Sequence, residues 1–173
     1  FSQKGPGAMH APWLISLAAG LVVGGLSQVS RLCTVGGFRD LFLFKKSILI
    51  FGYLAVLVGV FVVNISFGNF HLGFENQPIA HTDGLWNFLG MALAGFCSVL
   101  LGGCPLRQLI MTGEGNSDSA VTVLGLAAGA AFAHNFGLAA SGAGPTLNGE
   151  IAVVVGFIVA LIIAVVNTKR VNA

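Results

Sequence analysis

Hydrophobic residues gather in five long runs along the chain, with short polar connections between them. The runs cover residues 11–29, 47–65, 84–101, 120–140 and 151–166. Each run is near the roughly 20 residues that a helix needs to cross a bilayer. None of the five contains Asp, Glu, Lys or Arg. The pattern predicts an all-α, polytopic membrane protein with about five transmembrane helices.

The composition also indicates an integral membrane protein. Of 173 residues, 55% are hydrophobic and only 8% are charged, whereas a soluble domain carries about a quarter charged residues. The net charge of +2 comes without the basic run that nucleic-acid binding needs. Three cysteines, an odd number, argue against a disulfide framework. We therefore expect the lipid bilayer to surround the chain, and no nucleic acid among its partners.

The basic residues fall almost entirely on one side of the predicted arrangement. With five crossings, that side holds seven of the eight Lys and Arg residues, namely Arg31, Arg39, Lys45, Lys46, Arg107, Lys169 and Arg170. Only Lys4 lies opposite. Because positive charge is enriched on the cytoplasmic side of membrane proteins, we expect an outside N-terminus and a cytoplasmic C-terminus.

The first residues indicate that the chain is one part of a longer protein. Residues 2–7, which follow Phe1, contain glycine and proline and are typical of a linker. No signal peptide is visible before the first apolar run. An outside N-terminus without a signal suggests preceding membrane segments. We expect a single transmembrane domain over residues 1–173, within a longer chain.

One short stretch, residues 102–107, combines two glycines, a thiol, a proline and an arginine. Pro105 suits the first position of a helix and places Cys104 at its N-cap. A thiol there faces unpaired backbone N–H groups and the positive end of a helix dipole, a combination that attracts anions. Arg107 adds a fixed positive charge, and Gly103 precedes the thiol directly. A plain helix break explains Cys-Pro after two glycines equally well.

An earlier stretch of the chain echoes this one. Cys33 and Cys104 each follow a glycine by nine residues, and each is followed by an arginine and then x-Leu, at Arg39 and Arg107. We predict repeat units over about 11–65 and 84–140, with an extra helix over 150–168. In each unit the stretch after the cysteine, 33–44 or 104–111, is expected to form a short helix or a re-entrant piece. Two ordinary cytoplasmic loops are the alternative.

Three further polar or reactive residues lie inside the apolar runs. Cys97 precedes Cys104 by seven residues and so is expected near the same helix face, although a buried cysteine is often just a small hydrophobe. His134 and Asn135 lie in the fourth run, away from its ends. A histidine at that depth is either a functional group or a neutral side chain bonded across helices.

The polar connection 66–83 carries His71 and His81, whose spacing matches no metal template strongly. A solvated loop explains these residues, so we expect neither a metal nor another cofactor.

Two soft thiols with cationic support and no acidic partner favour recognition of a sulfur- or selenium-containing anion. A thiol is a weak donor and a polarisable surface for a terminal sulfur. Arginine and helix N-termini suit the oxyanion end of such a ligand. Weak contacts, first at Cys104 and then at Cys33, allow both binding and release.

These motifs resemble those of a known family. Residues 28–40 and 102–109 are similar to the two motifs of the YeeE/YedE family of sulfur-transport membrane proteins. Residues 77–87 and 133–138 resemble its YedE branch, which is associated with selenium metabolism.

The resemblance implies a bacterial inner-membrane permease rather than an enzyme, with this chain as its C-terminal half. Thiosulfate is the implied substrate of one branch and a selenium compound that of the other, carried along pore-lining cysteines on short helices. By match, Cys33 and Cys104 take that role, while Cys97 matches no family cysteine. The missing N-terminal half and a small cytoplasmic sulfur-carrier protein are candidate partners.

Two other functions are open. A membrane thiol oxidoreductase or sulfurtransferase would use the same cysteines covalently, although such enzymes commonly show a C-x-x-C pair, which the chain lacks. A purely structural membrane subunit is the second possibility, although helix packing alone does not require the repeated cysteine and arginine.

Overall fold

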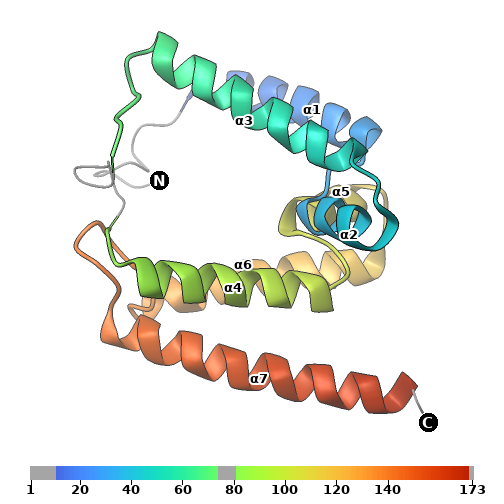
Figure 1. Cartoon of the computed structure of the whole chain (residues 1–173), viewed down its shortest axis with the longest axis vertical. Coiled ribbons are helices and arrows are strands. Elements are labelled where there is room, and N and C mark those ends of the chain that lie inside the picture. Colours follow the sequence, from blue (N-terminus) through green and yellow to red (C-terminus); the bar gives the residue numbers. More distant parts are fainter. Residues whose placement is uncertain (1–10, 74–80, 172–173) are drawn as a thin grey trace.

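The computed structural model describes residues 11–73 and 81–171, and in this part of the chain it is built from seven helices (Figure 1). They are α1 (Trp13–Ser30), α2 (Thr34–Phe44), α3 (Ile48–Ser66), α4 (Gly84–Leu100), α5 (Pro105–Gly113), α6 (Ser117–Asn135) and α7 (Leu147–Val171). The predicted all-α class is confirmed. The apolar runs become α1, α3, α4, α6 and α7, and the two cysteine motifs lead into the short helices α2 and α5.

Four spans of the described chain are long and apolar enough to cross a membrane. They are Trp13–Phe44, Ile48–Ser66, Gly84–Gly113 and Leu147–Thr168, so two of them contain a long helix together with the short helix that follows it. The fifth expected crossing corresponds to α6, which is 19 residues long. It is not among the four because Asp118 near its start and His134 and Asn135 at its end lower its hydropathy.

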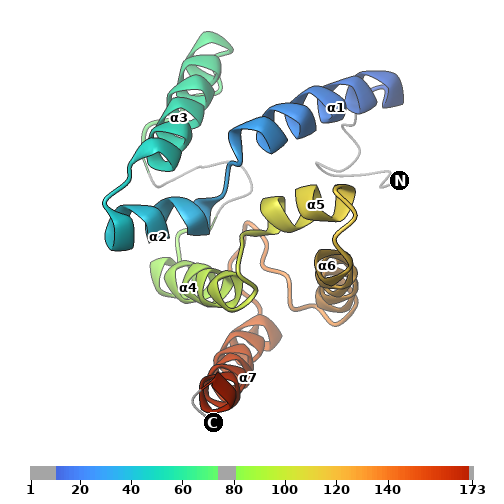
Figure 2. The ribbon, with the colours of Figure 1, turned by 90° about the vertical axis from the view of Figure 1, so that its right-hand side faces the viewer.

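The long helices form two groups, and the short helices lie between them. Figure 2 shows α1 and α3 on one side, α4, α6 and α7 on the other, and α2 and α5 crosswise in the middle. Helix α2 packs against α3 and α4, while α5 packs against α6 and α1. The two short helices therefore link the two groups of long helices.

The first three helices, α1–α3, and the next three, α4–α6, form two similar trios, and the long first helix of each trio ends in the same way. At the end of α1, Arg31 has a φ of 51° and its backbone N–H donates to the carbonyl of Gln28 at 3.3 Å. Just after α4, Gly102 has a φ of 74° and donates to the carbonyl of Val99 at 3.0 Å. This left-handed turn stops each long helix just before its cysteine.

The return helices also match. Helices α3 and α6 are both 19 residues long. Each is followed by a glycine in the left-handed region, Gly68 with a φ of 69° and Gly137 with a φ of 64°. Each trio therefore has the order of a long helix, a break, a short helix and a long return helix. Figure 1 shows the short helices of both trios, and the C-terminal end of α7, at the same end of the molecule.

We predict that Gly102→Ala lowers the free energy of unfolding by about 1 kcal/mol, because a Cβ is disfavoured at a φ of 74°. A Cβ at this position would meet nothing within 4 Å, so the cost is one of backbone conformation alone. Denaturant titration of the protein in detergent micelles measures the change.

Gly125→Ala is the matched control, since Gly125 lies inside α6 and a Cβ added there would also meet nothing within 4 Å. Alanine there should leave the stability unchanged or raise it. An equal loss in both variants would contradict the assignment of the cost to the turn.

Candidate functional site

Each of the two repeated cysteines stands directly before a short helix. Cys33 is the N-cap residue of α2, and its Sγ accepts from the N–H of Gly36 at 3.4 Å. Cys104 is the N-cap residue of α5, with Pro105 in the first turn. Both residues are buried, with 9% and 5% of their surface exposed. The helix start predicted from Pro105 is confirmed.

The fold brings these two cysteines together, although they lie 71 positions apart in the sequence. The Cys104 thiol lies close to the Cys33 thiol, to the Thr34 hydroxyl and to the backbone N–H groups of Thr34 and Arg107. Figure 2 shows why: α2 and α5 begin next to each other and run in opposite directions. Backbone N–H groups at the starts of two helices therefore face one thiol pair.

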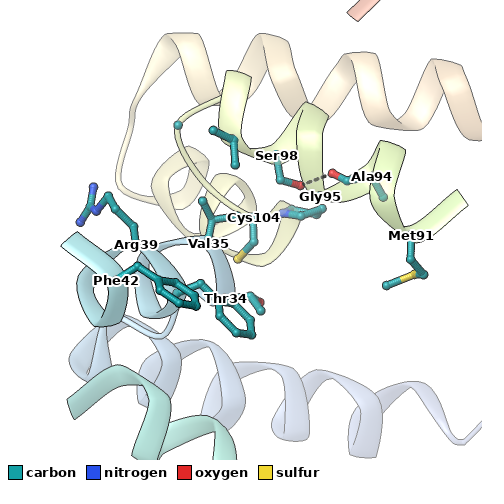
Figure 3. Close-up of a pocket in the computed structure, with 13 residues that line it drawn as sticks. Thr34, Val35, Arg39, Phe42, Met91, Ala94, Gly95, Ser98 and Cys104 are labelled. Atoms are coloured by element: carbon teal, nitrogen blue, oxygen red, sulfur yellow. Dashed lines mark hydrogen bonds between the residues drawn. The ribbon is translucent and has the colours of Figure 1, made fainter. Parts of the chain in front are cut away.

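A cavity of about 740 Å³ lies beside Cys104, lined by α2, α4 and the start of α5 (Figure 3). Most of its lining is apolar, and its polar lining residues are Thr34, Arg39, Ser98 and Cys104. The Ser98 hydroxyl donates to the carbonyl of Ala94 in its own helix at 2.8 Å. The Cys104 sulfur points toward Thr34.

The guanidinium of Arg39 is held by the next residue. It donates through Nε and an Nη to one carboxylate oxygen of Asp40, at 3.0 and 2.9 Å. Arg39 lines the cavity, but in Figure 3 its guanidinium points away from Cys104.

The guanidinium of Arg107 binds away from the thiols. It donates to Oε1 of Gln28 at 3.2 Å and lies 3.6 Å from a carboxylate oxygen of Glu114. The backbone N–H of Arg107 lies near Cys104. Both guanidinium groups therefore have an acidic partner, because Asp40 lies on the same short helix as Arg39 and Glu114 lies at the end of the helix that carries Arg107.

Gly103 shapes the turn between α4 and α5. A Cβ on Gly103 would lie 3.5 Å from Nε2 of Gln108 and 3.7 Å from Arg107. Gln108 is buried, and its Nε2 donates to the carbonyl of Leu101 at 3.0 Å. Glycine here leaves room for this amide, which ties α5 to the end of α4.

The expectation for Cys97 is wrong in its geometry. Because α4 ends at Leu100 and Cys104 lies beyond the break, the two cysteines do not share a helix face. Cys97 is half-buried and is not among the residues that line the 740 Å³ cavity.

The expectation that His134 and Asn135 lie away from the ends of their helix is also wrong. Both lie in the last turn of α6, because the helix ends at Asn135 rather than continuing to residue 140. The Asn135 amide donates to the carbonyl of Ala131 at 2.9 Å. Figure 1 shows this end of α6 at the opposite end of the molecule from α2 and α5.

Sequence reasoning missed a hydroxyl pair beside the thiols. Oγ1 of Thr34 and the phenol oxygen of Tyr53 lie 2.7 Å apart, and Tyr53 interacts electrostatically with both Cys33 and Cys104. The available signal was that Tyr53 is the single tyrosine of the chain and lies in an otherwise apolar run.

No group of three or more His, Cys, Asp or Glu residues that could hold a metal ion occurs within 11–73 and 81–171. The donors around the cavity are thiols, hydroxyls and backbone N–H groups. Such a set suits an anion better than a cation.

We predict that dibromobimane, which becomes fluorescent on joining two thiols, labels the wild-type protein and the Cys97→Ser variant. Cys33→Ser and Cys104→Ser should abolish the fluorescence, because the reagent then lacks one of its two nearby thiols. Fluorescence that depends on Cys97 instead would contradict the contact between Cys33 and Cys104.

Comparison with known proteins places the chain in a family. Residues 29–171 match the family described as sulphur transport, which includes the YeeE and YedE proteins. The thiosulfate transporter TsuA of Escherichia coli (strain K12) is 29% identical over 111 residues. The alignment covers 62% of this chain and 30% of the length of TsuA. No solved structure matches the chain significantly. With the cysteine motifs, the apolar helices and this match in agreement, the chain belongs to the sulphur transport family.

Proposed function

We propose that this chain forms part of a permease for a sulfur- or selenium-containing anion, with Cys104 and Cys33 as its contacts for the terminal chalcogen. The observation that carries the proposal is the meeting of the two thiols at two helix starts, beside a cavity of about 740 Å³. Membership of the sulphur transport family supports transport, and the similarity to a protein named thiosulfate transporter supports thiosulfate.

The chemistry of the site fits an anion with one soft end. Sulfur and selenium are polarisable, as is the thiol that would meet them. The N–H groups of Thr34 and Arg107 point to the same place and supply a positive potential without a mobile counter-charge. Most of the cavity lining is apolar, so these weak contacts are stronger there than they would be in bulk water.

Transport also needs release. Each thiol contact is weaker than an ion pair, and two such contacts side by side allow the anion to move from Cys104 to Cys33 in small steps. The guanidinium groups of Arg39 and Arg107 are already bound to Asp40, Gln28 and Glu114. They therefore do not trap the anion in a tight pair.

The substitution Cys104→Ser should reduce thiosulfate uptake about tenfold, because serine keeps a hydrogen-bond donor but lacks the polarisable sulfur that would contact the terminal chalcogen, and a loss of about 1.4 kcal/mol is a tenfold change. Cys33→Ser should act in the same direction. The measurement is uptake of radiolabelled thiosulfate into proteoliposomes that hold the full-length protein. Parallel assays with selenosulfate test the selenium substrate.

Cys97→Ser is the matched control and should transport normally, because Cys97 lies within α4, outside the cavity lining, and is not among the groups that interact with the Cys104 thiol. The proximity of the two thiols also suits the alternative enzyme. In that case the Cys104 thiolate would attack the outer sulfur of thiosulfate, form a persulfide and release sulfite. A persulfide on Cys104 with stoichiometric sulfite release, and without uptake, would overturn the permease.

We also propose that the end carrying α2 and α5 faces the cytoplasm of a bacterial inner membrane. Five cations, Arg31, Arg39, Lys45, Lys46 and Arg107, lie on or beside these two helices, as the enrichment of positive charge on the cytoplasmic side requires. A small cytoplasmic sulfur-carrier protein would meet the substrate at this end.

A membrane-impermeant maleimide applied to intact cells tests this orientation. In a background with the three cysteines changed to serine, we expect labelling of Asn69→Cys, which is exposed after α3. Lys46→Cys, exposed between α2 and α3, should react only after the cells are opened. The reverse pattern would invert the proposed orientation.

A further inference from the structure

We propose that Tyr53, acting with Thr34, recognises the oxyanion end of the substrate and selects oxygen-bearing sulfur anions over oxygen-free ones. This inference rests on the proposed function, because it assigns a second contact to the anion that the thiols hold.

The position of the hydroxyl pair is the first argument. Thr34 is the first residue of α2, directly after Cys33, and lines the cavity. Its hydroxyl lies 2.7 Å from the phenol oxygen of Tyr53 on α3. Tyr53 lies within electrostatic range of both Cys33 and Cys104. Because Thr34 lines the cavity beside Cys104, an anion with its soft end on the thiols would have its other end close to the Thr34 hydroxyl and, through it, to that of Tyr53.

Counting donors gives the second argument. Two hydroxyls carry two O–H groups, and their mutual hydrogen bond uses one of them, whichever residue donates. When Thr34 donates to Tyr53, the Tyr53 O–H is left to donate to a ligand; when Tyr53 donates, the Thr34 O–H remains, and it faces the Cys104 sulfur. In either orientation the pair therefore keeps one O–H at the thiol site, which a single serine or threonine bonded to its own helix does not.

The second trio of helices, α4–α6, has no equivalent hydroxyl pair. Pro105 stands first in α5 where Thr34 stands first in α2. Thr122 is the sixth residue of α6, as Tyr53 is of α3. The Thr122 hydroxyl donates to the carbonyl of Asp118 in its own helix at 3.0 Å. The hydroxyl pair thus lies only on the α2 and α3 side of the site. A bound anion would therefore be oriented with its oxygens toward that side.

The nearby arginine side chains are not available to contact the oxyanion end of the ligand. Arg39 is bound to Asp40, and Arg107 to Gln28 and Glu114. The Tyr53 and Thr34 hydroxyls are the side-chain donors that remain next to the thiols within the described part of the chain. Because the surroundings are apolar, one such donor discriminates strongly between an oxyanion and a ligand without oxygen.

Isothermal titration calorimetry of the full-length protein in detergent tests the proposal, with thiosulfate and hydrosulfide as the two ligands. Both present a soft sulfur to the thiols, but hydrosulfide has no second end that could accept a hydrogen bond. We expect Tyr53→Phe to raise the Kd for thiosulfate about tenfold or more and to leave that for hydrosulfide unchanged. Thr34→Val should do the same, whereas Thr34→Ser, which keeps the hydroxyl, should bind both ligands normally.

The possible outcomes separate this proposal from the function on which it rests. If wild-type protein binds thiosulfate, Cys104→Ser weakens that binding and Tyr53→Phe does not, the role of Tyr53 is overturned and the permease site stands. Equal weakening of both ligands by Tyr53→Phe and Thr34→Val would show a structural role and also overturn it. Failure of wild-type protein to bind thiosulfate would overturn both proposals.

Discussion

The meeting of two helix starts at one pair of thiols is the contact on which the site depends. The first N–H groups of any helix lack partners within the helix, and here α2 and α5 begin side by side within apolar spans of the chain. Such groups are costly without a partner where water is scarce. Cys33 satisfies one of them only weakly, through Gly36, because a thiol is a poor acceptor, and the Cys104 side chain makes no capping hydrogen bond. An anion would satisfy them better, so the arrangement is stable and yet ready for a ligand.

The long helices serve mainly to create this meeting point. Each trio stops a long helix with a left-handed residue, Arg31 or Gly102, and turns the chain into a short helix. The return helix, α3 or α6, then carries the chain back toward the end of the molecule where the long helix began. Because the two trios are built alike, their short helices arrive at the same end of the molecule, where they pack between the two groups of long helices (Figure 2).

The arginines have a structural role in this arrangement. Arg107 joins α5 to the end of α1 through Gln28, and Glu114 balances its charge at the end of α5. Arg39 is paired with its neighbour Asp40. Positive potential at the thiols therefore comes from backbone N–H groups, which are fixed by the helices and bring no flexible side chain into the cavity. The hydroxyl pair of Thr34 and Tyr53 adds the directional donor.

The sequence by itself determined the elements of the fold. Apolar runs of about 20 residues have one stable form in a bilayer, so α1, α3, α4 and α7 could be placed within a few residues. Pro105 fixed the start of α5, because proline suits that one position of a helix. These constraints are local, so they can be recognised from the sequence alone.

Only the tertiary structure decided which of the marked residues belong together. The break after Leu100 removed Cys97 from the face of Cys104, and the early end of α6 placed His134 far from the thiols. Arg107 has its partners on α1 and at the far end of α5, at Gln28 and Glu114, and the partner of the Thr34 hydroxyl is Tyr53, 19 residues along the chain. Spacing along a chain predicts contacts within one helix, whereas contacts across a helix break depend on how the chain turns and packs.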